Sequence, residues 1–192
     1  MGPSSARNNG VQNAKGDFIA FLDSDDEWHK EKLAIQMEII MEKSLDYLGA
    51  RFQYQSFEYN KKNKKQLGIY SLNKLLLKNV IATSGVIIRK KFFQELKGFD
   101  CNLKYAEDYD LWMRASLKKN LCVIKCPSLV KRKRSIHGLS SHMHQMFRGE
   151  LLVIKKLYTS GDIGFIKHFF LNIYISLKFS KRYLMNWNGK GI

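Results

Sequence analysis

Three carboxylates fall within four residues, directly after a short apolar run. The run is 18–22, and the acids are Asp23, Asp25 and Asp26. An apolar run this short, with aromatic and β-branched residues, predicts a strand buried within a parallel sheet. Because side chains alternate along a strand, we expect Asp23 and Asp25 to project to the same side where the strand ends.

Two carboxylates so close repel each other unless a positive charge lies between them. A hard divalent cation with oxygen ligands is the usual solution, and open α/β sheets bind ligands at the carboxyl ends of their strands. Asp23 and Asp25 are therefore candidate ligands for Mg²⁺ or Mn²⁺, with Asp25 the expected direct ligand. The alternative is that the acids only cap a helix beginning near His29 or Lys30, which Asp26 alone could do.

Size and charge limit the class of protein. With 192 residues, 45% of them hydrophobic, the chain fits one ordinary domain with room for a small appendage. A net charge of +16 raises nucleic acid or an anionic membrane as partners. The positive residues are mostly lysine, with no nucleic-acid motif, whereas arginine is the usual reader of phosphate and bases. We therefore expect no nucleic acid and favour lipid headgroups or sugar phosphates.

Cysteine usage and hydropathy bear on the compartment. Cys101, Cys122 and Cys126 have neither an even count nor zinc-ligand spacing, which indicates a reducing compartment. We find no signal-peptide pattern. The longest apolar stretch, 169–177, is well short of the roughly 20 residues needed to span a bilayer. The expected location is cytoplasmic, peripheral on the inner face of the cell membrane where a membrane is involved.

Hydrophobic periodicity and turn residues predict the elements that must position these acids. Helices are expected over 5–14, 30–43, 71–78, 91–97, 107–119, 140–158 and 163–183. Strands are expected over 18–22, 81–89, 121–125 and 130–136, with a hairpin over 47–70. In helix 30–43, an apolar face is expected from residues spaced three and four apart: Leu33, Met37, Ile40 and Met41.

A second acidic pair, Glu107 and Asp108, opens the expected helix 107–119. Acids in a first helical turn complement the helix dipole, so the pair alone is compatible with a purely structural role. Asp110 is expected to face another surface, because residues two apart diverge on a helix. The surrounding segments, 98–100 and 110–112, are what give the pair a chemical interpretation.

Four stretches in this order resemble the family 2 glycosyltransferases, inverting sugar transferases with a GT-A fold. They are Ala6-Arg7-Asn8-Asn9-Gly10 with Ala14-Lys15-Gly16; the Asp-x-Asp segment GDFIAFLDSDDEW; Thr83-Ser84-Gly85-Val86-Ile87-Ile88-Arg89; and Gly98-Phe99-Asp100 with Tyr105-Ala106-Glu107-Asp108-Tyr109-Asp110-Leu111-Trp112. The resemblance covers residues 4 to about 140. It implies an α/β fold with a GT-A-like mixed, mainly parallel sheet flanked by helices.

The resemblance assigns chemistry to both acidic pairs. It implies that Asp108 is the general base, which takes the proton from an acceptor hydroxyl as its oxygen attacks the anomeric carbon. Glu107 would orient the acceptor or the base. A cation held by Asp23 and Asp25 would neutralise the departing diphosphate.

The resemblance also implies contacts to the donor. Arg7 and Asn8 would approach the diphosphate or the ribose. Ser84 and Gly85, which lack bulky side chains, would let the sugar approach the backbone closely. These four are the candidate donor-binding residues, together with Asp23.

Two more candidates follow the expected strand 121–125. The family places a histidine here, in a loop that closes over the diphosphate and reaches the metal, which makes His137 a candidate ligand. Arg134 could pair with a phosphate through two hydrogen bonds. The alternative for His137 is an ordinary surface histidine.

The chain is expected to divide near residue 140. Residues 1–140 would form a partial catalytic domain, and 141–192 would form amphipathic helices with a basic rim, a pattern typical of elements at a membrane surface. The alternative is simple packing of these helices against the catalytic domain. Trp112 is expected to be a core residue.

The first strand of the family pattern, with the following helix and strands, has no counterpart here. We therefore expect an N-terminally truncated chain that lacks the first nucleotide-binding βαβ units. The expected function is metal-assisted, inverting transfer from a nucleotide-diphosphate donor, a UDP-sugar, to a glycan or lipid-linked glycan acceptor in cell-surface polysaccharide synthesis. The alternative is a catalytically inactive truncated remnant that acts as a binding or partner module.

Overall fold

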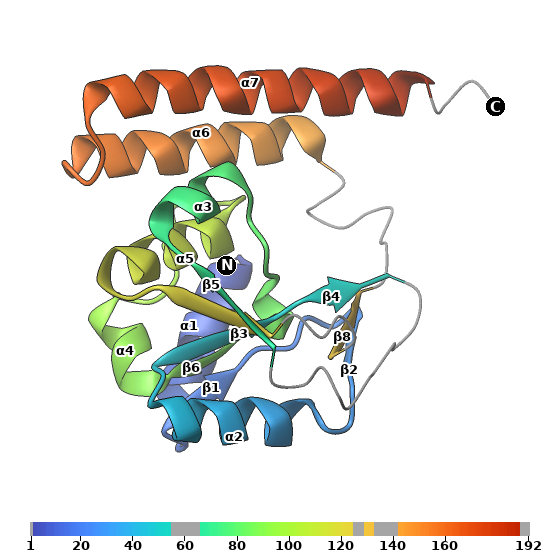
Figure 1. Ribbon diagram of the computed structural model, residues 1–192, viewed down its shortest axis with the longest axis vertical. Helices are drawn as coiled ribbons and strands as arrows, with labels where there is room; N and C mark the ends of the chain where they lie inside the picture. Colours follow the sequence, from blue (N-terminus) through green and yellow to red (C-terminus); the bar gives the residue numbers. More distant parts are fainter. Residues whose placement is uncertain (1, 55–65, 125–128, 133–141, 189–192) are drawn as a thin grey trace.

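The computed structural model describes residues 2–54, 66–124, 129–132 and 142–188. Strands lie between helices, and two long C-terminal helices stack over one end of the molecule (Figure 1). The helices are α1 (Pro3–Asn13), α2 (Lys32–Lys43), α3 (Leu72–Leu77), α4 (Lys90–Glu95), α5 (Glu107–Lys118), α6 (Met143–Thr159) and α7 (Phe165–Asn188), with a 3₁₀ turn η2 (Thr83–Gly85). The strands are β1 (Phe18–Ala20), β2 (Asp26–Trp28), β3 (Tyr47–Ala50), β4 (Phe52–Gln53), β5 (Leu67–Tyr70), β6 (Ile87–Arg89), β7 (Leu121–Ile124) and β8 (Val130–Arg132).

The larger sheet has five strands in the order β1-β6-β3-β7-β5. Strand β6 is antiparallel to β1 and to β3, and β5 is antiparallel to β7. Among the described strands of this sheet, only β3 and β7 run parallel. The prediction of a mainly parallel sheet is therefore wrong for the described strands, and the sheet is mixed. Strands of three or four buried residues have the same apolar content in either direction, so their sequence does not reveal how they pair.

The predicted hairpin over 47–70 is also wrong for the described strands. Strand β7 lies between β3 and β5 and pairs with both of them, so these two strands do not pair with each other. The partner that separates them comes some fifty residues later in the chain, which local turn chemistry cannot indicate.

A second, smaller sheet has the order β2-β8-β4. The acidic segment therefore leads into a strand, in which Asp26 pairs with Arg132 of β8. Helix α2 begins only at Lys32, and its N-cap residue, Glu31, makes no capping hydrogen bond through its side chain. The alternative in which the acids merely cap a helix is wrong.

Helix α2 buries a different face from the one predicted. Ile40 is fully buried as expected, but Leu33 and Met41 are 45% and 67% exposed. The buried face instead includes two polar residues, Lys32 and Gln36. A prediction from hydrophobic periodicity turns the apolar residues of a helix toward the core. It therefore selects the wrong buried face for a helix that buries polar side chains.

The C-terminal helices share the larger of two buried clusters with the sheet and α5. Val153 and Ile154 of α6 and Leu171 and Ile175 of α7 are buried there, as is the predicted core residue Trp112. Among the described helices, none is long and apolar enough to cross a membrane. A division of the chain at residue 140 stays a prediction.

Candidate functional site

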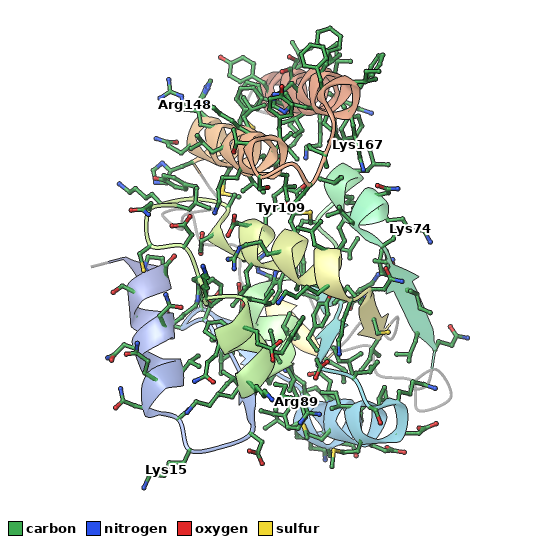
Figure 2. The ribbon with its side chains drawn as sticks, turned by 90° about the vertical axis from the view of Figure 1, so that its left-hand side faces the viewer. Lys15, Lys74, Arg89, Tyr109, Arg148 and Lys167 are labelled. Atoms are coloured by element: carbon green, nitrogen blue, oxygen red, sulfur yellow. The ribbon has the colours of Figure 1, made fainter. Side chains whose placement is uncertain are left out.

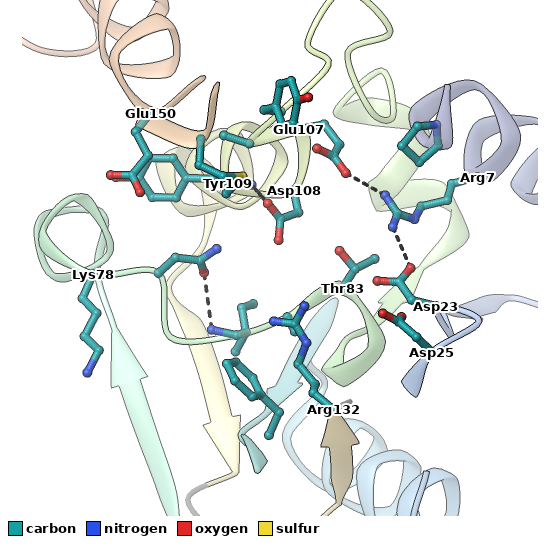
Figure 3. A pocket seen from close by; sticks show the side chains of 18 of the residues that line it. Arg7, Asp23, Asp25, Lys78, Thr83, Glu107, Asp108, Tyr109, Arg132 and Glu150 are labelled. Atoms are coloured by element: carbon teal, nitrogen blue, oxygen red, sulfur yellow. Dashed lines mark hydrogen bonds and ion pairs between the residues drawn. The ribbon is translucent and has the colours of Figure 1, made fainter. Parts of the chain in front are cut away.

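A cleft of about 690 Å³ brings the two acidic pairs together. Asp23 and Asp25, in the loop between β1 and β2, line one side of it. Glu107 and Asp108, in the first turn of α5, line the other (Figure 3). The two acidic pairs, to which the resemblance assigns parts of one reaction, therefore line a common cavity.

The loop that carries the first pair is held from beneath by Ser84. The backbone N–H of Asp23 donates to Ser84 Oγ at 3.1 Å, and Trp28 Nε1 donates to the Ser84 carbonyl at 2.8 Å. Ser84 and Gly85 are buried and do not line the cleft, whereas Thr83 does. A Cβ on Gly85 would lie 2.5 Å from the Ala50 carbonyl oxygen. These residues therefore support the acidic loop from behind.

Arg7 joins the two acidic pairs. Its guanidinium donates to Asp23 Oδ1 at 2.6 Å and to Glu107 Oε1 at 2.8 Å, which Figure 3 shows as two dashed lines. The side chains of Arg7 and Glu107 are 17% and 10% exposed, so the contact is largely shielded from water. One cation thus fixes the distance between the end of β1 and the start of α5.

Asn8 takes no part in the cleft wall. Its side-chain amide donates to the Phe99 carbonyl at 2.8 Å and accepts from the Phe99 N–H at 2.9 Å. The neighbouring Gly98 has a φ of 65° and approaches Asn8 so closely that a Cβ would lie 2.7 Å from the Asn8 side-chain oxygen. Asn8 and the segment 98–100 therefore anchor α1, where the resemblance implied contact with the donor.

Asp110 lies away from the cleft, as predicted, but it is buried. Its carboxylate is 2.6 Å from Arg114 Nη2 and 2.6 Å from Lys156 Nζ, and Lys156 also pairs with Asp100 at 2.7 Å. This network ties α5 to α6 and to the loop before α5. It therefore holds the helix whose first turn presents Asp108.

Asp108 is a carboxylate of the cleft wall with a strongly raised pKa. Burial raises its pKa to about 6, the neighbouring Glu107 carboxylate adds to the rise, and Arg7 and Arg132 oppose it. Asp108 Oδ1 also accepts the N–H of Tyr109 at 2.7 Å. A carboxylate with a pKa close to neutrality is ionised at pH 7 yet basic enough to accept a proton during a reaction.

The backbone before α5 is unusual for a residue with a side chain. Ala106 precedes the helix at φ 60° and ψ 25°, in the left-handed region. Gly149 of α6 packs against this turn, and a Cβ there would lie 2.8 Å from the Tyr105 carbonyl oxygen. Helix α6 therefore supports the turn that aims Asp108 into the cleft.

The two aspartates can hold a cation only with help from a substrate or water. In residues 2–54, 66–124, 129–132 and 142–188 there is no group of three His, Cys, Asp or Glu side chains that could hold a metal ion. Asp25 is exposed, and Asp23 already gives one oxygen to Arg7. Mg²⁺ is commonly bound by one or two carboxylates, with waters and phosphates as its remaining ligands, so the pair fits such an ion. His137 and Arg134 lie outside the described residues.

Sequence reasoning missed several residues of the cleft. Arg132 is the clearest: its Nε is 3.7 Å from Asp26 Oδ1, and burial raises the Asp26 pKa while Arg132 opposes that rise. The partnership depends on the register of β2 against β8, which the sequence does not reveal. Figure 3 shows the Arg132 side chain between Asp108 and Asp25. Further missed residues that line the cleft are Lys78, Tyr105, Met146, Glu150, Tyr174, Lys178 and Arg182.

Known proteins are similar to this chain in sequence. A family model described as "Glycosyl transferase family 2" matches residues 1–97. The chain is 28% identical over 139 residues to an Escherichia coli UDP-Glc:alpha-D-GlcNAc-diphosphoundecaprenol beta-1,3-glucosyltransferase, WfgD, a match that covers 69% of this chain and 51% of WfgD. It is 33% identical over 128 residues to the amylovoran biosynthesis glycosyltransferase AmsB of Erwinia amylovora, covering 58% of this chain and 40% of AmsB.

Solved structures agree on the fold. S. aureus TarS 1-349 in complex with UDP-GlcNAc superposes with a TM-score of 0.62 at 21% identity, covering 81% of this chain and 47% of that one. The chain thus spans about half the length of WfgD and of this TarS structure, and less of AmsB. The family model covers half of the chain, and with the acidic loop, the α5 acids and the GT-A-like fold it places the chain in glycosyl transferase family 2.

Proposed function

We propose that this chain carries the catalytic acids of a transferase that moves a sugar from a UDP-sugar to a glycan or lipid-linked glycan acceptor with inversion. The carrying observation is that Asp108, with its raised pKa, faces the same cleft as Asp23 and Asp25. The name of WfgD supports a UDP-linked donor and a lipid diphosphate acceptor, and that of AmsB supports polysaccharide synthesis. The chain matches about half of WfgD and less of AmsB, so this support comes from relatives that it covers only in part.

In the proposed reaction Asp108 is the general base. Its carboxylate accepts the proton of an acceptor hydroxyl, and the hydroxyl oxygen forms a bond to the anomeric carbon. The bond from that carbon to the donor phosphate oxygen breaks on the opposite face, and UDP leaves with the electron pair. Attack and departure on opposite faces invert the configuration of the sugar.

The departing diphosphate needs positive charge. Mg²⁺ or Mn²⁺, when bound at Asp23 and Asp25, would supply Lewis-acid stabilisation of that charge. Arg7 and Arg132 place guanidinium groups on the wall of the same cleft, where each can donate hydrogen bonds to phosphate oxygens. Glu107 holds Arg7, and we assign it a positioning role on that ground.

The test is donor turnover by Asp108→Asn beside the wild type. We expect a loss of about 10²–10⁴-fold, because the amide cannot accept the proton. Glu95→Gln is the matched control, since Glu95 is an exposed acid on α4 outside the cleft, and it should keep wild-type turnover. Equal turnover of Asp108→Asn and the wild type would contradict the proposal.

A second readout keeps loss of activity separate from loss of fold. The raised pKa means that the folded state holds the Asp108 proton more tightly than the unfolded chain, so ionisation at higher pH costs stability. Asp108→Asn removes that cost and should be more stable than the wild type at about pH 8, by on the order of 1 kcal/mol. Urea unfolding measures this.

A further inference from the structure

Helix α7 carries an apolar face that has no partner among the described residues. Its members are Ile166, Phe170, Ile173, Leu177 and Leu184, and they are 72%, 63%, 43%, 65% and 61% exposed. Spacings of three, four and seven put these positions on one side of the helix. Figure 1 places α7 on the outside of α6, and Figure 2 shows side chains projecting from its outer side.

This face is not the one that holds the helix in place. Leu171 and Ile175, which are 6% and 1% exposed, bury the opposite side of α7 in the larger core cluster. The two long helices also pack along each other, and Phe147 of α6 stacks on Phe179 of α7 at 4.4 Å between ring centroids. The outer apolar residues are therefore not needed to hold α7 against α6, and an exposed patch of this kind marks an interaction surface.

The charges around the face select among possible partners. Residues 142–188 contain two acids, Glu150 and Asp162, against seven basic residues. Lys156 and Lys178 pair with acids of the chain, whereas Arg148, Lys155, Lys181 and Arg182 are exposed. A second copy of this chain would bring like charges together at the rim. An anionic bilayer accepts apolar side chains at its interface and pairs its headgroups with the exposed basic residues of the two helices.

We propose that the outer face of α7 docks on the surface of an anionic lipid bilayer, with the helix lying in the plane of the interface. Tyr174, Lys178 and Arg182 of the same helix line the cleft that contains Asp108. These residues lie on the cleft side of α7, so docking of the outer face holds that end of the cleft about 10 Å from the bilayer surface, the width of one helix, on the side where a lipid-linked acceptor would present its sugar. This last step rests on the proposed function, whereas the docking itself does not.

Vesicle flotation tests the docking without any sugar donor. The chain should bind vesicles of equal parts phosphatidylcholine and phosphatidylglycerol, and bind phosphatidylcholine vesicles at least about tenfold more weakly, because the headgroup charges are then absent. Phe170→Ser/Leu177→Ser should lower the affinity for the anionic vesicles by about tenfold or more. The matched control is Leu33→Ser/Met41→Ser on α2, which changes two similarly exposed apolar residues and should bind as the wild type does.

Several outcomes would overturn the proposal. One is equal binding to both vesicle types, or none to either. Another is unchanged vesicle binding by the α7 variant, with circular dichroism confirming its fold. Self-association in sedimentation that the α7 variant abolishes, without vesicle binding, would identify the face as a contact between copies of the chain. Donor turnover is measured separately, so a chain that floats without turning over donor contradicts only the transferase proposal.

Discussion

The titration of Asp108 depends on burial and on charged neighbours of both signs, Glu107 on one side and Arg7 and Arg132 on the other. Glu107 raises its pKa and Arg132 lowers it, with burial as the largest cause of the value of about 6. If Asp108 is the base, turnover is constant above about pH 6 and falls tenfold per pH unit below it, because only the carboxylate accepts a proton. The acidic limb of the pH–rate profile therefore reports this residue.

Substituting one neighbour of each sign should move that limb in opposite directions. Glu107→Gln removes a like charge and should shift it to lower pH, and Arg132→Gln removes an opposing charge and should shift it to higher pH, each by up to about one unit. The measurement is the pH dependence of kcat/KM for each variant. A limb that stays in place in both variants would show that another group carries the proton.

Lys32 is a buried cation outside the cleft. Its side chain is fully buried, its Nζ has no hydrogen-bond partner among the described residues, and its ammonium lies 4.2 Å from the centre of the Trp28 ring. Burial lowers its pKa to about 7. The folded state releases this proton more readily than the unfolded chain, so this residue makes stability rise with pH between about 7 and 10.5.

Lys32→Met should therefore stabilise the protein at neutral pH. The methionine fills similar space without a charge to desolvate, and we expect a gain of about 1–3 kcal/mol. Urea unfolding of both proteins at about pH 7 and pH 9.5 measures it, and the gain should shrink at the higher pH as wild-type Lys32 becomes neutral. A variant less stable than the wild type at both pH values would show that the contact with Trp28 outweighs the cost of burial.

At the scale of elements, Gly149 sets how closely α6 packs against the turn Tyr105–Ala106, which precedes Asp108. A Cβ on Gly149 would lie 2.8 Å from the Tyr105 carbonyl oxygen and 3.1 Å from the Ala106 Cβ, whereas a Cβ on Gly10 of α1 would meet nothing within 4 Å. Both glycines lie inside helices, so alanine improves helix propensity equally at both. The difference between the two variants therefore isolates the contact with the turn.

Gly149→Ala should destabilise the protein by about 1–3 kcal/mol, since backbone atoms of the turn must move. Gly10→Ala should be neutral or stabilise it by up to about 1 kcal/mol. Thermal or urea unfolding measures both. If the two variants prove equally stable, α6 does not press on the Tyr105–Ala106 turn as closely as the structure indicates.

Local sequence signals were sufficient for most elements and insufficient for their pairing. The helix opened by Glu107 and the strand ending before Asp23 were recognisable from caps, apolar runs and acids. Strand direction and partner were not, because β7 enters between β3 and β5 from far along the chain. The same limit hid Arg132, whose place in the cleft depends on the register of β8 against Asp26. Ser84 was found as a motif, but its role beneath the loop required the fold.

For the whole molecule, the net charge of +16 acts on folding and on docking with opposite signs. The folded state holds its positive charges closer together than the unfolded chain does, so self-repulsion opposes folding. Added salt screens this repulsion over about 10 Å at 0.1 M. It also weakens exposed ion pairs, but those contribute only about 0–1 kcal/mol each.

We therefore expect the urea midpoint to rise when KCl is raised from low to moderate concentration, while vesicle binding falls over the same range. The first follows because salt relieves repulsion within the folded chain, and the second because salt screens the attraction between the basic rim of α7 and anionic headgroups. Measuring the urea midpoint and vesicle binding in the same buffers separates these two charge effects from a general effect of salt on the protein. Vesicle binding that rises with KCl alongside the midpoint would mean that apolar insertion alone holds α7 on the bilayer, and that its lysines contribute nothing to docking.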